Sequence, residues 1–221
     1  MQEWTTIGTA RVADGSEFVL ARRGDDEWVV RVEGRVLMGN RVHDSEEALA
    51  EEALARAEGA SLVLVGGLGL GYTLRAVLDI VGAEAEVTVA ELVPELVEWN
   101  RAHLGHLADH PLADPRTRVA VGDVYELLKK SPRMFDAILL DVDNGPEAIS
   151  QAKNQRLYAE GGVAACAAAL RPGGVLAVWS AGENAKYVKR LERHGFGVDV
   201  VRVAARAGSR ARHVIFMGER G

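Results

Sequence analysis

The sequence of 221 residues has a single cysteine, no long apolar run and no surplus of basic residues. One cysteine cannot form a disulfide within the chain, so Cys166 favours a reducing compartment, and its Ala-rich surroundings suggest a small buried side chain rather than a nucleophile. No stretch reaches the ~18 apolar residues of a membrane span. Residues 1–9 lack the basic and apolar segments of a secretory signal. We therefore expect a cytoplasmic protein that does not cross a membrane.

The charge balance argues against a nucleic-acid partner. The formal net charge is -6, with 26 Lys and Arg against 32 Asp and Glu. Proteins that bind nucleic acids usually gather basic residues on one surface, where they neutralise phosphates. The basic residues here are scattered, apart from a short C-terminal run that we interpret as a solvated hairpin: Arg202, Arg206, Arg210 and Arg212.

Residues 1–42 differ from the rest of the chain. Two short runs rich in β-branched and aromatic residues begin at Phe18 and Trp28. Gly24-Asp25-Asp26 separates them, and Glu33-Gly34 follows the second run. This pattern predicts two or three antiparallel strands. So small a sheet has too little core to stand alone, so we expect it to pack on the main domain or on a second subunit, in a homodimer.

A second unit, residues 43–221, is predicted to begin with a helix. Asp44 is expected at the N-cap, with Glu47 three residues later in the pattern of a capping box. The acidic first turn also suits the helix dipole. The helix is expected to run to about Glu58 and to stop at Gly59.

From Ser61 onward the chain alternates between apolar runs typical of buried strands and helical stretches. This alternation predicts a doubly wound α/β fold with a mostly parallel, seven-stranded sheet covered by helices on both faces. The last two runs read as a hairpin, which predicts an antiparallel edge strand. Strands are expected near 62–65, 87–90, 118–121, 135–140, 175–179, 198–203 and 212–217, and helices near 72–80, 94–104, 124–130, 156–170 and 184–194.

A glycine-rich loop follows the first buried strand and contains Gly66, Gly67, Gly69 and Gly71. Glycines allow a tight turn and a close approach of ligand to backbone. A dinucleotide fingerprint would need a third glycine at residue 72, which is Tyr72, so a nicotinamide oxidoreductase is disfavoured. The observed spacing resembles the loop of class I S-adenosylmethionine-dependent transferases.

Acidic residues end the strands that follow. Glu91 lies 20 residues beyond Gly71, where a carboxylate can accept both ribose hydroxyls. Gly122 and Asp123 follow the third strand, where Asp123 can bind an adenine amine, cap the next helix, or do both. Asp141 ends the fourth strand. Because open α/β sheets bind ligands at the carboxyl ends of their strands, these residues predict one adenosyl-binding crevice.

These features together resemble spermidine synthases, a branch of the class I methyltransferase-like fold, over nearly the whole chain. The resemblance implies S-adenosylmethionine or its decarboxylated form as the group donor, a small amine-like acceptor, and Asp141 as the carboxylate that activates the acceptor. It rests on the small N-terminal β element, Gly66 to Gly71, Glu91 with Val93-Pro-Glu-Leu-Val, Asp114-Pro-Arg, Gly122-Asp123, Asp141 through Gly145-Pro146, Leu157-Tyr158 and Leu170-Arg-Pro-Gly-Gly.

The sequence departs from this family at the acceptor. Gly69 stands where the family has an aspartate for the donor's aminopropyl amine, and Asn144, with Asp143 beside it, stands at the second polyamine-binding aspartate. The family's Tyr-His-Glu near the first long helix is absent, and Ser45-Glu-Glu-Ala-Leu-Ala-Glu keeps only acids. The resemblance therefore predicts an acceptor other than putrescine.

The expected chemistry is an in-line displacement at a sulfonium, in which Asp141 takes the proton of an amine nucleophile. Asp143 and Glu147 either attract a cationic acceptor or are solvated loop acids, and Tyr158 either walls the acceptor pocket or packs in the core. Two alternatives stay open: methyl transfer to a small molecule, and a ligand-binding homologue without catalysis.

His103, His106 and His110 superficially suggest a metal site, but a solvent-exposed turn is the better interpretation, so no metal is expected.

Overall fold

The computed structural model describes every residue except 1–2, 13–14, 143–155 and 206–210. Three residues of the predicted acceptor region, Asp143, Asn144 and Glu147, lie outside the described residues. All the other residues predicted to form the site are described. No helix among the described residues is long and apolar enough to cross a bilayer.

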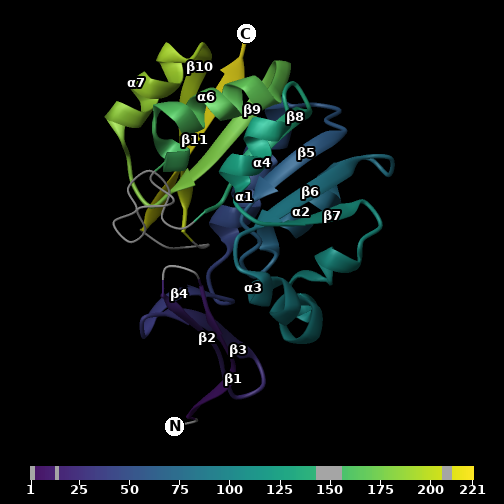
Figure 1. Ribbon diagram of the computed structural model, residues 1–221, viewed down its shortest axis with the longest axis vertical. Helices are drawn as coiled ribbons and strands as arrows, with labels where there is room; N and C mark the ends of the chain where they lie inside the picture. Colours follow the sequence, from purple (N-terminus) through teal and green to yellow (C-terminus); the bar gives the residue numbers. More distant parts are fainter. Residues whose placement is uncertain (1–2, 13–14, 143–155, 206–210) are drawn as a thin grey trace.

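A seven-stranded sheet forms the centre of the larger unit (Figure 1). Its strands lie in the order β10-β11-β9-β8-β5-β6-β7, and all except β11 run in one direction. This confirms the predicted doubly wound, mostly parallel sheet. The strands are β5 (Leu62–Gly66), β6 (Glu86–Glu91), β7 (Thr117–Val121), β8 (Phe135–Leu140), β9 (Leu170–Ser180), β10 (Phe196–Ala204) and β11 (Arg212–Arg220).

The reversed strand is not the edge strand, contrary to the sequence-based expectation. β11 pairs antiparallel with both β10 and β9, so it is inserted between them and β10 forms the edge. A hairpin fixes that two strands pair, but it does not fix which of them joins the sheet. Burial decides here, because Val214, Ile215, Phe216 and Met217 of β11 are all buried.

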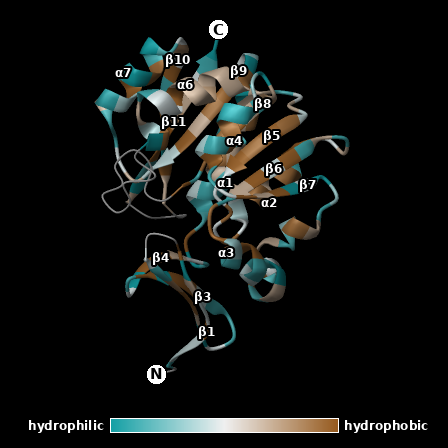
Figure 2. Ribbon diagram, viewed as in Figure 1, coloured by the Kyte–Doolittle hydropathy of each residue, from teal (hydrophilic) through white to brown (hydrophobic). Residues whose placement is uncertain are grey.

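Helices cover both faces of the sheet, which makes three layers. Leu64 and Ile138 belong to the core on one face, and Val63, Val65 and Leu139 belong to the core on the other, as expected for strands buried on both sides. Figure 2 shows the apolar strands between more polar helices. The first face carries α4 (Val124–Lys130), α6 (Glu160–Ala169) and α7 (Ala185–Arg193), and the second carries α1 (Asp44–Arg56), α2 (Tyr72–Ile80) and α3 (Pro94–Trp99).

The first long helix begins differently from the prediction. His43, not Asp44, is the N-cap residue, and no side chain caps the helix. Asp44 is already helical, and the Glu47 carboxylate contacts His43 Nδ1 at 2.8 Å instead of returning to the backbone. The predicted capping box is therefore wrong, although the acidic first turn still suits the helix dipole.

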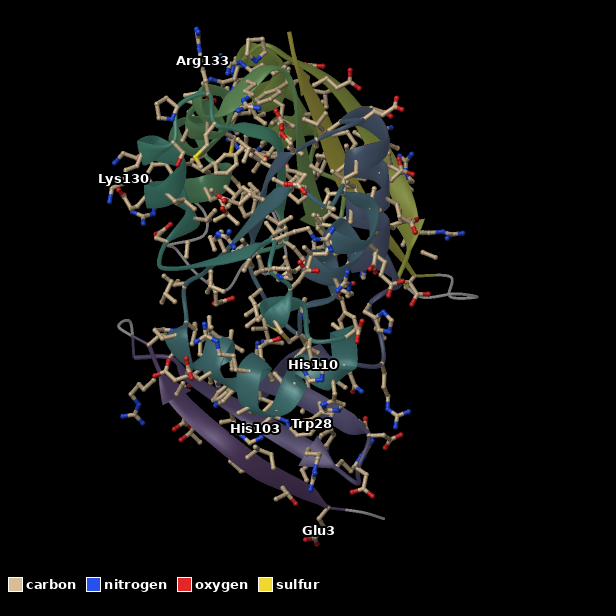
Figure 3. All side chains as sticks on the ribbon, turned by 90° about the vertical axis from the view of Figure 1, so that its right-hand side faces the viewer. Glu3, Trp28, His103, His110, Lys130 and Arg133 are labelled. Carbon is tan, nitrogen blue, oxygen red and sulfur yellow. The ribbon has the colours of Figure 1, made fainter. Side chains whose placement is uncertain are left out.

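The N-terminal sheet has four antiparallel strands, more than the two or three predicted, and it packs on the main unit. A Cβ on Gly8 would lie 2.6 Å from Nε1 of Trp99, so only glycine lets β1 approach α3 this closely. Figure 3 shows Trp28 and His103 at this junction. The strands are β1 (Trp4–Arg11), β2 (Glu17–Arg23), β3 (Glu27–Val32) and β4 (Arg35–Gly39), and one π-helical and two 3-10 turns follow α3 at Asn100–Leu104, Gly105–Ala108 and Pro111–Ala113.

Candidate active site

The glycine-rich loop runs from the end of β5 to the start of α2. Gly67 has a φ of 93°, and a Cβ added there would lie 2.3 Å from the backbone oxygen of Asp141. No other residue fits this contact, so Gly67 brings the loop against the end of β8. Gly66 is the last residue of β5, Gly69 lies within the loop, and Gly71 is the N-cap of α2, also with a φ of 93°.

Glu91 braces this loop from the end of β6. Its side chain is buried, with 6% of the residue exposed, and its two carboxylate oxygens accept hydrogen bonds from the backbone N–H groups of Leu68 (3.0 Å) and Val93 (2.8 Å). A carboxylate has about four acceptor positions, so these two bonds are compatible with the ribose contact that the sequence predicts. The residue thus shapes the loop as well as the cavity beside it.

Asp123 serves as a helix cap, as predicted. Its Oδ1 accepts the backbone N–H of Tyr125 at 2.8 Å, at the start of α4. Its Oδ2 forms an ion pair with Arg156, whose guanidinium also lies 5.0 Å from the centre of the Tyr125 ring. Gly122 donates its N–H to the backbone oxygen of Glu91, which joins the ends of β6 and β7.

Asp141 follows β8 at the centre of the crevice. Its backbone N–H donates to the oxygen of Gly66 at 2.8 Å, and its Oδ2 accepts a 2.6 Å hydrogen bond from the hydroxyl of Thr73. Thr73 is buried in the first turn of α2. The carboxylate is therefore held between the glycine-rich loop and α2 rather than left to rotate in solvent.

Two cavities meet at Asp141. The first, here called the strand-end cavity, brings together five of the predicted adenosyl residues at the ends of β5, β6 and β7; Gly66 and Gly71 are not among its lining residues. The second, here called the Glu46 cavity, opens beside the start of α1 and α2. Both are lined by Leu37, Met38, Gly69 and Asp141; the strand-end cavity adds Phe18, Gly67, Ala90, Glu91, Leu92, Val93, Leu96, Gly122, Asp123, Val124 and Val142, and the Glu46 cavity adds Gly39, Glu46, Leu68, Leu70, Tyr72, Thr73 and Trp179.

The N-terminal sheet supplies part of both walls, through Leu37 and Met38 of β4 and Phe18 of β2. An apolar cover beside converging carboxylates lowers the local dielectric and strengthens the field of those charges. The small sheet is therefore part of the site, as well as being packed on α3.

Glu46, like Thr73 and Trp179, lines the site although the sequence analysis did not select it. Burial, reinforced by the charge of Asp141, raises the pKa of its carboxyl to about 7. Two acids that face one cavity cannot both ionise easily, and such pairs are common where protons are transferred. The sequence placed Glu46 in an acidic first helical turn, which conceals a cavity-facing acid among solvated ones.

A tyrosine, a histidine and acids also assemble here from separate segments. The His43 and Tyr72 rings stack with centroids 4.0 Å apart, and His43 contacts Glu47. Burial, followed by the negative charges of Glu46 and Glu47, raises the pKa of Tyr72 to about 12, so its phenol is neutral at physiological pH. The contiguous Tyr-His-Glu motif is absent, yet Tyr72 and Glu46 line the Glu46 cavity and His43 packs behind the Tyr72 ring.

Tyr158 packs in the core. It is 3% exposed, its hydroxyl donates to the Val142 oxygen at 2.9 Å, and its ring meets Tyr187 edge-on. It is not among the residues that line either cavity. Of the two roles considered for Tyr158, the described structure therefore supports packing.

The histidines near the end of α3 serve the junction with the N-terminal sheet. His103 stacks on Trp28 with centroids 6.5 Å apart, and His106 meets the same ring edge-on at 5.9 Å (Figure 3 shows His103 and Trp28). Within the described part of the chain, no group of three or more His, Cys, Asp or Glu is arranged to hold a metal ion. Cys166 is buried in α6, where burial raises the pKa of its thiol to about 12.

Comparisons with known proteins agree with this geometry. Residues 43–195 match the family model described as "Spermine/spermidine synthase domain". Polyamine aminopropyltransferase 2 of Pseudomonas aeruginosa is 34% identical over 145 residues, which is 61% of this chain and 39% of that protein. The polyamine aminopropyltransferase of Mycobacterium tuberculosis is 32% identical over 165 residues, 73% of this chain and 30% of that protein. This chain thus matches well under half the length of both relatives.

Solved structures agree at the level of the fold. A spermidine synthase in complex with the transition-state analogue AdoDATO superposes with a TM-score of 0.81 at 20% identity, over 98% of this chain and 74% of that one. The spermidine synthase from Thermotoga maritima gives a TM-score of 0.78 at 20% identity, over 98% of this chain and 73% of that one. The fold shared with these proteins includes the N-terminal sheet.

Proposed function

Because the chain belongs to the spermine/spermidine synthase family, we propose that it transfers an aminopropyl group from decarboxylated S-adenosylmethionine to an amine-like acceptor other than putrescine. The observation that carries this proposal is the meeting of two cavities at Asp141, with a second acid, Glu46, in one of them. One cavity suits the donor's adenosyl part, and the other suits the acceptor.

The strand-end cavity is assigned to the donor. Glu91 would accept the ribose hydroxyls, Asp123 the exocyclic amine of adenine, and the loop from Gly66 to Gly71 would let the ligand approach the backbone. A Cβ at Gly122 would meet nothing within 4 Å, which leaves open space beside Asp123. The polyamine aminopropyltransferase relatives support the aminopropyl donor, in preference to methyl transfer.

The Glu46 cavity is assigned to the acceptor. Two carboxyl groups, Glu46 and Asp141, favour a cationic molecule, and the rings of Tyr72 and Trp179 supply apolar walls. An aliphatic ammonium must lose a proton before it can attack, since its ordinary pKa is about 10. Asp141 accepts that proton at the boundary of the two cavities, and Asp143 and Asn144 stay candidate contacts for the remainder of the acceptor.

The transfer itself balances without a redox partner. The amine nitrogen forms a bond to the propyl carbon on sulfur, the carbon–sulfur bond breaks, and the sulfur keeps the electron pair as a neutral thioether. The chain's contribution is to hold both reactants in line and to take up the proton. Because Asp141 lines both cavities, a donor in one cavity and an acceptor in the other would both lie beside its carboxylate.

Methyl transfer from S-adenosylmethionine is a second candidate, and Gly69 favours it. Glycine has no acid side chain that could bind the aminopropyl amine of the decarboxylated donor. Among the described residues, the only atom within 4 Å of a Cβ placed at Gly69 is the sulfur of Met38, at 3.5 Å, so no neighbouring acid replaces it. A homologue that binds the donor without catalysis is the third possibility.

A series of binding and turnover experiments separates these functions. Mass analysis of the ligand retained by the purified protein, followed by calorimetry with S-adenosylmethionine, its decarboxylated form, the thioether products and NAD, identifies the donor. Turnover assays of the decarboxylated donor with linear diamines and triamines then identify the acceptor. We expect binding of the decarboxylated donor and slow turnover of putrescine. Tight binding of NAD alone would refute the proposal.

A further inference from the structure

A buried serine hydroxyl connects Glu46 to a histidine on strand β11 of the sheet. Ser45 is 1% exposed, and its Oγ donates to Glu46 Oε2 at 2.8 Å. The same oxygen lies 3.0 Å from Nδ1 of His213 on β11. Residues 45 and 213 are distant in sequence, so only the fold brings this chain of three groups together.

The histidine end of this chain reaches another cavity. This outer cavity is lined by Ser45, Glu46, Trp179 and His213, together with residues of the N-terminal sheet, and it shares Glu46 and Trp179 with the Glu46 cavity. The Trp179 and His213 rings meet edge-on with centroids 4.6 Å apart, which fixes the orientation of the imidazole. Glu46 thus lines both cavities, and the hydrogen-bonded chain leads from it to Ser45 and His213, which line only the outer one.

We propose that Ser45 and His213 form a proton relay that carries the acceptor's proton from Glu46 to the outer cavity. This inference rests on the proposed transfer to an amine acceptor. Ser45 and His213 act through Glu46 and touch neither reactant, so they are positioning residues rather than catalytic ones.

Each step of the relay conserves protons. The acceptor ammonium gives a proton to the Glu46 carboxylate, directly or through Asp141. Protonated Glu46 donates to Ser45 Oγ, while the Ser45 hydroxyl donates its own proton to His213 Nδ1. The resulting imidazolium releases its Nε2 proton to the outer cavity. Water in that cavity then removes the Nδ1 proton and returns one proton to Nε2, so each turnover exports one proton and restores the Nε2–H tautomer.

The pKa shifts at the two ends make His213 a transient carrier of the proton rather than its resting site. Burial and the charge of Asp141 raise the pKa of Glu46 to about 7, with Glu47 on the same helix adding to the effect, so Glu46 exchanges a proton readily near neutral pH. Burial lowers the pKa of His213, so the imidazole is neutral at rest and, once protonated, releases its proton readily. The neutral phenol of Tyr72 lies beside Glu46, the indole of Trp179 packs on His213, and the charged residues Glu27 and Arg41 of the outer cavity form an ion pair with each other.

Nuclear magnetic resonance tests the relay without any acceptor. With ¹⁵N-labelled histidine, the His213 nitrogen signals of the wild type should show an inflection near pH 7 that follows Glu46. Glu46→Gln should abolish this inflection, and Ser45→Ala should reduce it to the weak through-space effect of the carboxylate. An inflection of wild-type size in both variants would overturn the relay, whatever the protein's activity.

Turnover gives the second test. We expect Ser45→Ala and His213→Asn to lower kcat about tenfold, less than the ~10²–10⁴ of losing an acid–base group itself. Added imidazole buffer should restore the rate of both variants, and their solvent deuterium isotope effect should exceed that of the wild type. His110→Asn is the matched control, because His110 lies outside all three cavities and asparagine tolerates its left-handed backbone.

The outcomes separate the two proposals. Wild-type protein that turns over no amine, yet shows the Glu46–His213 coupling, would contradict the amine-transfer function and leave an acid–serine–histidine contact with another role. Wild-type protein that turns over an amine, with variants that keep its rate and isotope effect, would contradict the relay alone.

Discussion

The hydroxyl of Thr73 donates a 2.6 Å hydrogen bond to Oδ2 of Asp141, so the first turn of α2 holds the carboxylate at the wall between the two cavities. This contact restricts rotation of the side chain. A base fixed in this way does not have to be reoriented during the reaction, which is the advantage of a preorganised site.

Asp141→Asn should reduce kcat by ~10²–10⁴, as is typical when a general base is lost. The amide keeps the shape of the side chain and can still accept the Thr73 hydrogen bond, so donor affinity should change far less. Stopped-flow or discontinuous assays, combined with calorimetry of the donor, measure the two effects separately. Thr73→Val is the companion variant, with a smaller expected loss, and a wild-type rate for Asp141→Asn would remove Asp141 from the mechanism.

Glu91→Ala should weaken donor binding and the fold together. Loss of the ribose hydrogen bonds corresponds to roughly 1.5–3 kcal/mol of binding free energy, and the two buried N–H groups of Leu68 and Val93 would lose their acceptor, at about 1–3 kcal/mol of stability. Calorimetry and urea unfolding measure these quantities. Glu86→Ala, at the opposite end of β6, is the control. Unchanged donor affinity in a folded Glu91→Ala protein would show that Glu91 does not touch the ribose.

Stability should fall as pH rises through the range set by Glu46. Its ordinary pKa is 4.5 and its folded pKa is raised to about 7, so between these values the folded protein binds more protons than the unfolded chain. The stabilisation from this group is complete below about pH 4.5 and is lost as pH rises through about 7. His213, whose folded pKa is lowered, acts in the opposite direction, with stability rising as pH increases through its ordinary value of 6.5.

The Glu46→Gln variant isolates the Glu46 contribution, since His213 is present in both proteins. We expect the thermal unfolding midpoint of the wild type to decrease relative to that of Glu46→Gln between pH 5 and pH 8. Scanning calorimetry across this range checks the difference. If the thermal unfolding midpoints of the two proteins changed with pH in the same way, the Glu46 carboxyl would titrate normally.

The sequence predicted the central sheet well and the local details less well. Apolar runs such as Leu62 to Val65 identify strands buried on both faces because their environment is uniformly apolar. The strands Trp4–Arg11 and Arg35–Gly39 were missed, since sheet edges carry mixed polar and apolar residues. The capping box at Asp44 failed because a backbone shift of one residue changes which side chain can reach the helix end.

The candidate site likewise contains residues that the sequence could predict and residues that it could not. Gly67, Glu91, Asp123 and Asp141 follow from the rule that parallel strands end at one edge. Glu46 does not, because its role depends on the distance between α1 and the end of β8, which no local pattern encodes. The contacts of Ser45 with His213 depend in the same way on packing between distant segments.

Homodimer formation is proposed through the N-terminal sheet. Its edge strand β4 exposes Val36 to 59%, and an open edge with an apolar side chain favours a partner strand. We expect light scattering at high micromolar concentration to give a dimer, and Val36→Lys to shift it toward monomer. Val121→Lys is the control, because Val121 is 56% exposed on the edge strand β7 of the other sheet. A wild-type monomer would refute this prediction.

Gly69→Asp should strengthen binding of the decarboxylated donor. Gly69 has a φ of 52°, a left-handed conformation that aspartate and asparagine tolerate better than most residues, and its added Cβ would make ordinary contact with the Met38 sulfur at 3.5 Å. The new carboxylate would face the wall that both cavities share. There it could bind the aminopropyl ammonium of the donor.

The gain should be about 1.5–3 kcal/mol in binding free energy, the range for a hydrogen bond to a charged group. It should be absent for S-adenosylmethionine, whose carboxylate the new charge would repel. Gly69→Asn is the matched control, because it imposes the same backbone conformation without the charge. Calorimetry of both donors with the three proteins measures the effect. Equal affinities in the aspartate and asparagine variants would show that the donor's amine does not lie beside residue 69, which would withdraw the main reason for expecting altered donor recognition in this chain.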